Sequence, residues 1–289
     1  MRPLVIAEYS SCLKVRNGKL VLRLQGQKVE QEWAPGAFPY DTVVCDPMGG
    51  FVTFPALRWL ADRGVVLTLL NFDGRPVLTA LPDHPINGRD RIAQLKAYSN
   101  PQKRVEMARE ILRAKVGREV PQDLRDLNRL RMWEAEIAAR YWSDLGIVRD
   151  YPKARDPTNA AINYSFGLLE SVTRRMIHRL GLEPSIGFLH VPRGPSDGKS
   201  AFVYDVMEPY RETAARVALA ERPRRADYFV MFGGTVRLRQ GFTQALARRF
   251  AKAFPEREMG EWLRRLTLRM ALPPLSNLPG PQPSLPERP

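Results

Sequence analysis

Glu134 is the first residue in this 289-residue chain whose position suggests chemistry as well as packing. It stands within a stripe of apolar residues at the three- and four-residue spacing of a buried helix face. That stripe consists of Leu127, Leu130, Ile137, Tyr141 and Leu145. Because an unpaired buried carboxylate is costly, Glu134 needs a partner, commonly arginine, lysine or a metal ion. On spacing alone, an ion pair with one of the many arginines is the simpler interpretation.

His190, Asp205 and Glu208 are the other candidates, and each also has an ordinary structural interpretation. A lone histidine such as His190 is more often a structural residue than a ligand. Asp205 and Glu208 are three residues apart, which puts both carboxylates on one helix face. The same spacing fits a capping box at a helix start, and spacing alone favours the cap. His84 and His178 are expected on the surface.

If folding brings these groups together, two carboxylates and an imidazole make an oxygen-rich site for Mg²⁺ or Mn²⁺. Such an ion can activate a nucleophile and stabilise the charge that develops on a phosphate during substitution. Zinc is less favoured, because no second histidine and no cysteine pair falls at ligand spacing. These residues therefore leave metal-assisted phosphate chemistry and purely structural roles both open.

The elements that position these groups begin with a small β-rich lobe, expected over residues 1–80. Extended runs are predicted at 4–9, 12–16, 19–24, 42–45, 65–70 and 77–81. Asn17-Gly18 readily takes the positive φ angles of a two-residue turn and predicts a hairpin between the second and third runs. A short helix over 55–63 is expected to end at Gly64.

Residues 81–89 are a cluster of helix-breaking residues and are expected to link this lobe to a larger all-α lobe over 90–272. Helices are predicted at 90–99, 101–116, 122–145, 157–180, 206–221, 241–253 and 256–271, with a small hairpin at 228–239. The tail, 273–289, holds seven prolines and is expected to be a flexible extension. The predicted fold class is therefore α+β, with a β-rich N-terminal lobe, a linker and an α-helical C-terminal lobe.

The net charge of +14 favours a polyanionic partner. It is unevenly distributed: residues 1–90 hold 10 basic and 9 acidic residues, and residues 91–289 hold 35 and 22. No apolar run approaches the roughly 20 residues of a membrane span, and the N-terminus lacks the features of a signal peptide. Only two cysteines are present, which excludes a disulfide framework and is consistent with the cytoplasm.

Four ordered segments resemble motifs of the CRISPR-associated adaptation integrase family. They are 134–141 (EAEIAARY), 156–169 (DPTNAAINYSFGLL), 181–190 (GLEPSIGFLH) and 202–211 (FVYDVMEPYR). A fifth, GGTVRL, is similar to a later Gly-Gly-Val-Arg-Leu segment of the family. Two departures are Ala135, where the family usually has glycine, and Phe166, where tyrosine is common. Neither position carries a candidate ligand.

The resemblance implies that Glu134, His190 and Glu208 ligate Mg²⁺ or Mn²⁺, with Asp205 as a supporting carboxylate in the catalytic site. It thereby overrules the ion-pair and capping interpretations. The implied activity is that of a DNA endonuclease and integrase. The 3′-hydroxyl of a captured DNA fragment, the spacer, attacks a phosphodiester at a CRISPR repeat.

The implied assembly contains a homodimer formed through the β lobe. Two such dimers flank a dimer of a small CRISPR adaptation partner protein, which makes a hetero-hexamer. Double-stranded DNA, both protospacer and repeat, lies across it, and no membrane is involved.

Three alternatives remain. The nearest is a casposon-type or solitary homologue that acts as a transposase or a structure-selective nuclease. Casposon enzymes carry extra C-terminal DNA-binding elements, for which a seventeen-residue tail is too short. A non-catalytic DNA-binding scaffold would be favoured by the loss of a ligand, and all three ligands are present. An unrelated basic metal-binding nuclease would require the ordered motifs to arise by chance.

Overall fold

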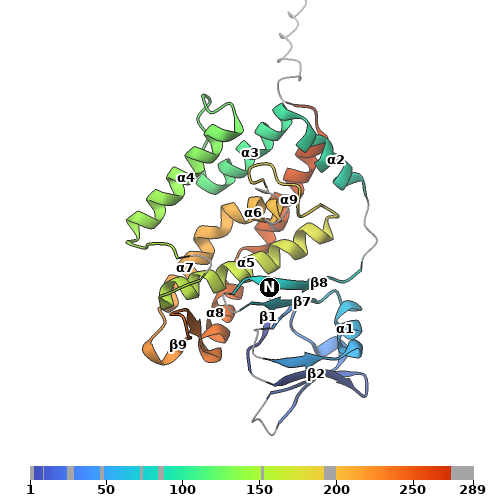
Figure 1. The fold of residues 1–289 in the computed structure, drawn as a ribbon. Coiled ribbons are helices and arrows are strands. Elements are labelled where there is room, and N and C mark those ends of the chain that lie inside the picture. Colours follow the sequence, from blue (N-terminus) through green and yellow to red (C-terminus); the bar gives the residue numbers. More distant parts are fainter. Residues whose placement is uncertain are drawn as a thin grey trace, which may run out of the picture.

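The computed structural model describes residues 3–8, 10–24, 29–45, 49–71, 74–83, 88–150, 153–191 and 200–274. Strands β1–β8 (residues 3–80) gather at one end of the molecule with α1 (Phe54–Ala61), and the other helices, with the short strands β9 and β10 (residues 228–238), form the rest (Figure 1). This arrangement confirms the predicted α+β class. His84 and the tail beyond Pro274 lie outside the described residues.

The N-terminal strands form two four-stranded sheets. One has the order β4-β3-β2-β6 and the other the order β1-β5-β7-β8. Their bounds are β1 Pro3–Ile6, β2 Ser11–Arg16, β3 Lys19–Arg23, β4 Gln31–Trp33, β5 Thr42–Cys45, β6 Gly50–Val52, β7 Val66–Leu70 and β8 Pro76–Ala80, with α1, Phe54–Ala61, between β6 and β7. The predicted hairpin is confirmed, with Asn17 at φ 52° and Gly18 at φ 74°. All six predicted extended runs overlap a strand, whereas β4 and β6 were not predicted.

The helical part is built around α5, most of whose residues are buried. The helices are α2 Gly88–Ser99, α3 Pro101–Val116, α4 Leu127–Asp144, α5 Pro157–Arg179, α6 Ala201–Met207, α7 Arg211–Glu221, α8 Gln240–Ala253 and α9 Glu256–Ala271. A hairpin of β9, Tyr228–Val230, and β10, Val236–Leu238, lies among them as predicted. The predicted helix 206–221 is instead α6, a 3-10 turn at Glu208–Tyr210, and α7. None of the described helices is long and apolar enough to cross a membrane.

The sheet β1-β5-β7-β8 lies between the two parts of the molecule (Figure 1). Successive side chains of a strand point to opposite faces, so this sheet serves two cores. Leu4 and Val43 pack with the other sheet and α1, whereas Val5 and Val44 pack with the helices. The strands that begin the chain therefore share a core with the helical part.

A polar contact and a close backbone approach also hold α5 against this sheet. The hydroxyls of Thr68 and Ser171 form a buried hydrogen bond of 2.7 Å. Gly167 passes so close to the turn at Gly74 that a Cβ atom added to Gly167 would lie 2.0 Å from the Gly74 carbonyl oxygen. Only glycine fits at this point of α5, because a normal Cβ contact is well above 3 Å.

Candidate metal centre

Asp205 lies inside α6 with a fully buried side chain, and it organises the segment that carries His190. Its Oδ2 accepts hydrogen bonds from the backbone N–H groups of Phe188, at 2.5 Å, and Leu189, at 3.1 Å. Its Oδ1 accepts from the backbone N–H of His190 at 2.8 Å. The capping interpretation of Asp205 and Glu208 is therefore wrong: Asp205 binds a segment that precedes it by 15 to 17 residues.

The same Asp205 oxygen orients the ring of His190. His190 Nδ1 lies 2.8 Å from Asp205 Oδ1 and donates to it, which leaves Nε2 facing Glu208, 3.6 Å from Glu208 Oε1. Burial acts to lower the pKa of His190, but the hydrogen bond and charge of Asp205 and the charge of Glu208 outweigh it, so the pKa is raised. A histidine held by a carboxylate through one nitrogen is the usual arrangement of a metal ligand.

Glu208 begins the 3-10 turn after α6, and its side chain is only 2% exposed. Burial acts to raise the pKa of this carboxyl. The positive charges of Arg211, Lys115 and His190 outweigh that effect and lower the pKa. Arg211 Nε lies 2.9 Å from Glu208 Oε1. Glu208 is thus held as a buried carboxylate.

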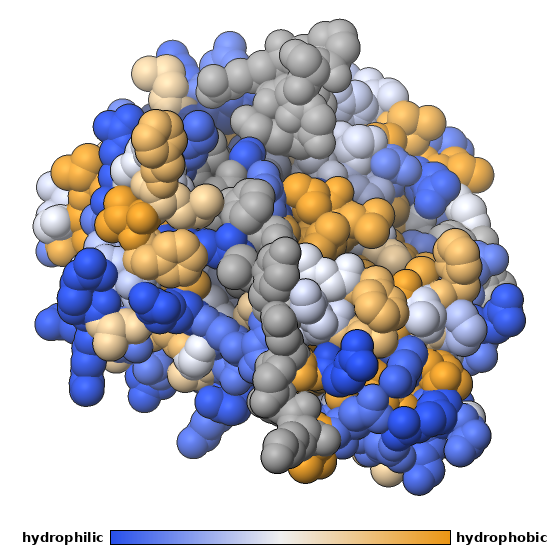
Figure 2. Space-filling view, turned by 60° about the horizontal axis from the view of Figure 1, so that its bottom comes forward, coloured by the Kyte–Doolittle hydropathy of each residue, from blue (hydrophilic) through white to orange (hydrophobic). Residues whose placement is uncertain are grey.

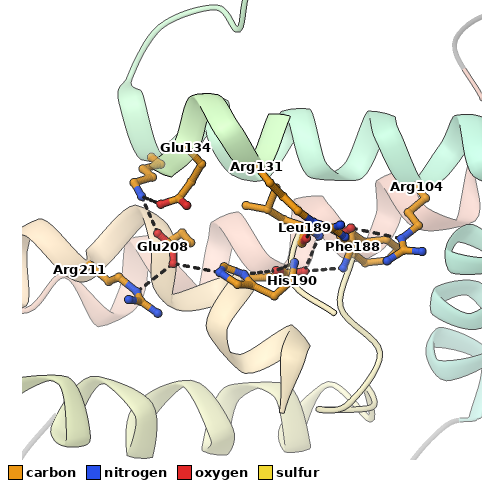
Figure 3. Close-up of polar contacts among 10 residues, drawn as sticks. Arg104, Arg131, Glu134, Phe188, Leu189, His190, Glu208 and Arg211 are labelled. Atoms are coloured by element: carbon orange, nitrogen blue, oxygen red, sulfur yellow. Dashed lines mark hydrogen bonds and ion pairs between the residues drawn. The ribbon is translucent and has the colours of Figure 1, made fainter. Parts of the chain in front are cut away.

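Glu134 reaches the same point from α4, as Figure 3 shows. Lys115, near the end of α3, donates from Nζ to Glu134 Oε1 and, at 2.7 Å, to Glu208 Oε2. The partner of Glu134 is therefore a lysine, which is one of the three partners considered from the sequence, and not one of the arginines that spacing alone favoured. The expectation of a buried stripe around Glu134 holds for Leu130 only; the other residues of the stripe within α4 are half-buried and Leu145 is exposed.

Two carboxylates that bind one ammonium group show that this position suits a cation. Oxygen atoms from Glu134 and Glu208 converge on a single nitrogen, and His190 Nε2 lies beside Glu208. Two carboxylates and an imidazole suit Mg²⁺ or Mn²⁺. No group of three or more potential ligands among the described residues is spaced to hold an ion as it stands. The residues fit a divalent ion, provided that the ammonium leaves.

A pocket of about 780 Å³ opens onto these groups and combines basic with aromatic side chains. The Arg149 guanidinium lies 4.9 Å from the centre of the Trp142 ring, and that of Arg211 lies 5.6 Å from the centre of the Phe166 ring. Arginines suit phosphate oxygens and aromatic rings suit bases, so the lining fits a nucleic acid.

The fold thus brings all four predicted residues, Glu134, His190, Asp205 and Glu208, into one region. His178, expected on the surface, is half-buried, and its Nε2 lies 2.8 Å from the Pro82 carbonyl oxygen. Sequence reasoning missed Lys115 and Arg211. Lys115 is 19 residues from Glu134 and 93 from Glu208, so no local spacing could have indicated its role.

Comparisons with known proteins agree in pointing to one family. The family model for CRISPR associated protein Cas1 matches residues 4–120 and 117–252. A relative named CRISPR-associated endonuclease Cas1 2, from Pyrobaculum aerophilum, is 25% identical over 239 residues, which cover 72% of this chain and 78% of the relative.

Two solved structures show a similar fold. A casposase bound to integration product superposes with a TM-score of 0.84 at 20% identity, covering 94% of this chain and 91% of the casposase chain. A chain of a Cas6-RT-Cas1–Cas2 complex gives a TM-score of 0.68 at 16% identity, over 93% of this chain and 34% of that one.

Proposed function

Because the chain belongs to the family of CRISPR associated protein Cas1, we propose that it is a metal-dependent DNA endonuclease and integrase. It inserts captured DNA fragments at a CRISPR repeat by attack of a 3′-hydroxyl on a phosphodiester. The observation that carries the proposal is the convergence of Glu134 and Glu208 on one cation, with His190 Nε2 beside them. The name of the Pyrobaculum aerophilum relative, an endonuclease, supports the same activity.

In this proposal Glu134, His190 and Glu208 hold Mg²⁺ or Mn²⁺. The bound ion supplies stabilisation of the negative charge that develops on the phosphate under attack. Asp205 is a positioning residue: it accepts from Nδ1 of His190 and so keeps Nε2 directed at the site. Arg211 keeps Glu208 ionised in a buried position.

Double-stranded DNA is the proposed substrate, and the charge distribution supports it. Residues 91–289, which contain the site, hold 35 basic and 22 acidic residues, whereas residues 1–90 are nearly neutral. Neutralising phosphates releases counterions, which gives affinity largely independent of sequence. The arginines of the pocket would then bring a phosphate to the carboxylates.

We also propose a homodimer through residues 1–80, and a hetero-hexamer with a small dimeric adaptation partner. β6 is an edge strand, and Phe51 on β6 and Phe54 at the start of α1 are exposed. Figure 2, which brings this end of the molecule forward, shows hydrophobic residues in patches between hydrophilic ones. The name of the Cas6-RT-Cas1–Cas2 complex, a structure of similar fold, supports a Cas2-type partner.

A transposase or a stand-alone nuclease is the second candidate, and the TM-score of 0.84 with a casposase favours it. A strand-transfer assay distinguishes the two activities. The protein is incubated with a short DNA duplex, the partner, and plasmids that carry or lack a repeat array, with Mg²⁺, Mn²⁺ or a chelator.

The proposal predicts covalent joining at the repeat boundary that the chelator abolishes. Joining at random positions, or at a non-repeat target, would support the second candidate. Equal joining in the presence of the chelator would contradict metal dependence in both.

A further inference from the structure

We propose that Lys115 is a tethered counter-cation that occupies the metal position until a divalent ion displaces it, and that it thereby weakens the metal affinity of the site. The inference rests on the proposed function, because it assumes that Glu134 and Glu208 are metal ligands. In this inference a lysine on α3 sets the concentration of divalent ion at which the metal site becomes occupied.

The geometry places the ammonium of Lys115 between the two carboxylates. Nζ donates to Oε1 of Glu134 and to Oε2 of Glu208. Its side chain is 13% exposed and that of Glu208 is 2% exposed, so the contact is largely screened from water. Among the described ion pairs, Lys115 alone bridges two of the candidate ligands, because Arg211 pairs with Glu208 only.

The charge balance explains why a cation stands there. Glu134 and Glu208 are two like charges at one point, and they repel each other unless a positive charge lies between them. Lys115 supplies that charge from within the chain. A largely buried pair of carboxylates without it would be costly, so the arrangement stabilises the metal-free protein.

The same arrangement opposes metal binding. A divalent ion needs the carboxylate oxygens that now bind the ammonium, and two cations cannot share them at such close range without strong repulsion. Lys115 must therefore leave when the ion enters. Its flexible four-carbon stem permits this, and its side chain lines the 780 Å³ pocket, which offers space to move into.

A purely structural role for Lys115 makes a different prediction. In that case Lys115 only ties α3 to α4 and to the turn at Glu208. Its removal would then lower the stability of the protein and leave the intrinsic affinity for metal unchanged or weaker. Affinity for Mn²⁺ in the absence of DNA therefore separates the two roles.

The test is a titration of the full-length protein with Mn²⁺ in the absence of DNA. Binding is measured by calorimetry or by the electron paramagnetic resonance signal of free Mn²⁺. The variants are Lys115→Met and Lys115→Gln, the second in case the first does not fold. The matched control is Arg113→Met, because Arg113 lies on the same helix and pairs with Glu110 and Glu119, away from the site. Thermal melting is recorded with and without Mn²⁺.

We expect the Lys115 variants to bind Mn²⁺ at least about tenfold more tightly than the wild type, which corresponds to about 1.4 kcal/mol. The Arg113→Met affinity should stay within about twofold of the wild type, since that change leaves the site intact. Without metal, the Lys115 variants should melt at lower temperature, and Mn²⁺ should raise their melting temperature by more than that of the wild type. Adding Glu134→Gln to Lys115→Met should remove the gain in affinity.

Equal or weaker Mn²⁺ affinity in the Lys115 variants, with the wild type still binding, overturns the inference and leaves the proposed metal site standing. Absence of Mn²⁺ binding in the wild type and in both Lys115 variants overturns the metal site itself, and the inference with it. A gain in Arg113→Met equal to that in Lys115→Met also overturns the inference, because the effect would then be one of net charge alone.

Discussion

Both oxygens of Asp205 accept hydrogen bonds from the segment that carries His190, at full burial. Three of the donors are backbone N–H groups of consecutive residues, 188–190. Replacement of one oxygen by an amide NH₂ would place a hydrogen-bond donor against these N–H donors. Asp205 therefore determines where the ring of His190 lies, although it is not itself a candidate ligand in our account.

Asp205→Asn is accordingly expected to lower the free energy of unfolding by about 3 kcal/mol, the range for a buried charged group that loses its hydrogen bonds. Mn²⁺ affinity should fall as well, because His190 loses its orientation. Urea denaturation and a Mn²⁺ titration measure the two effects. The matched control is Asp126→Asn, an exposed helix cap at α4 where asparagine serves equally well. Unchanged stability in Asp205→Asn would show that the hydrogen bonds at Asp205 contribute little.

The three carboxylates and one histidine of the site were predicted mainly because the segments that contain them resemble family motifs. Spacing alone favoured a capping box for Asp205 and Glu208, because the signature of a cap depends only on local distance along the chain. The true partners of Asp205 lie in the loop before α6, and those of Glu208 include Lys115, 93 residues away. Contacts of that range depend on how α3, α4 and α6 pack, which no local pattern encodes.

At the scale of the elements, α5 positions the site by joining the sheet to the helices. Its backbone at Gly167 touches the turn at Gly74, and Ser171 bonds to Thr68 on β7. A carbonyl oxygen of the backbone cannot move aside as the end of a flexible side chain can. Any side chain at position 167 would therefore push α5 away from the sheet.

Gly167→Ala should lower the free energy of unfolding by about 2 kcal/mol or more, as overpacking in a close contact does. Gly260→Ala on α9 is the matched control, because a Cβ there meets nothing within 4 Å. That control should raise stability by up to about 1 kcal/mol, the helix propensity gain of alanine over glycine. Urea unfolding of both variants gives the comparison. Similar effects of the two substitutions would contradict the close approach described for α5.

The longer elements were predictable because their periodicity extends over many residues, as in α3, α5 and α9. The strands β4 and β6 have three residues each, too few for an alternating pattern to stand out. α6 was not predicted as a separate helix because it spans only seven residues and is apolar on most sides. Packing against α5, more than local sequence, explains its conformation.

At the scale of the whole molecule, the net positive charge is concentrated in one part of the chain. The first 90 residues are nearly neutral and expose Phe51 and Phe54 beside an edge strand. The remaining residues carry most of the positive charge, and copies of that part would repel one another. Self-association is therefore expected through the N-terminal part, which leaves the basic part available for DNA.

The wild type should accordingly sediment at twice the chain mass of 32.9 kDa at micromolar concentration. The double substitution Phe51→Lys/Phe54→Lys should sediment as a monomer, because it places charges in the apolar contact. Val148→Lys is the matched control: Val148 is more exposed than either phenylalanine but lies in the helical part, so its replacement should leave the dimer intact. A wild-type monomer, or a dimer that survives the double substitution, would contradict this interface.

The central claim is that Glu134, His190 and Glu208 act together on one divalent ion, and parallel assays of DNA joining and DNA binding test it most directly. The wild type and the three single alanine variants are compared in strand transfer with Mn²⁺ and in binding to a labelled duplex, with the double variant Glu134→Ala/His190→Ala beside them. Our account predicts that each single substitution abolishes joining and cleavage. The double variant should be no worse than either single one, because the effects of residues that act as a unit are not additive. DNA binding should persist in all of them, because the binding charge comes from arginines elsewhere in the chain. A folded Glu208→Ala protein that still joins DNA at the wild-type rate would contradict the account.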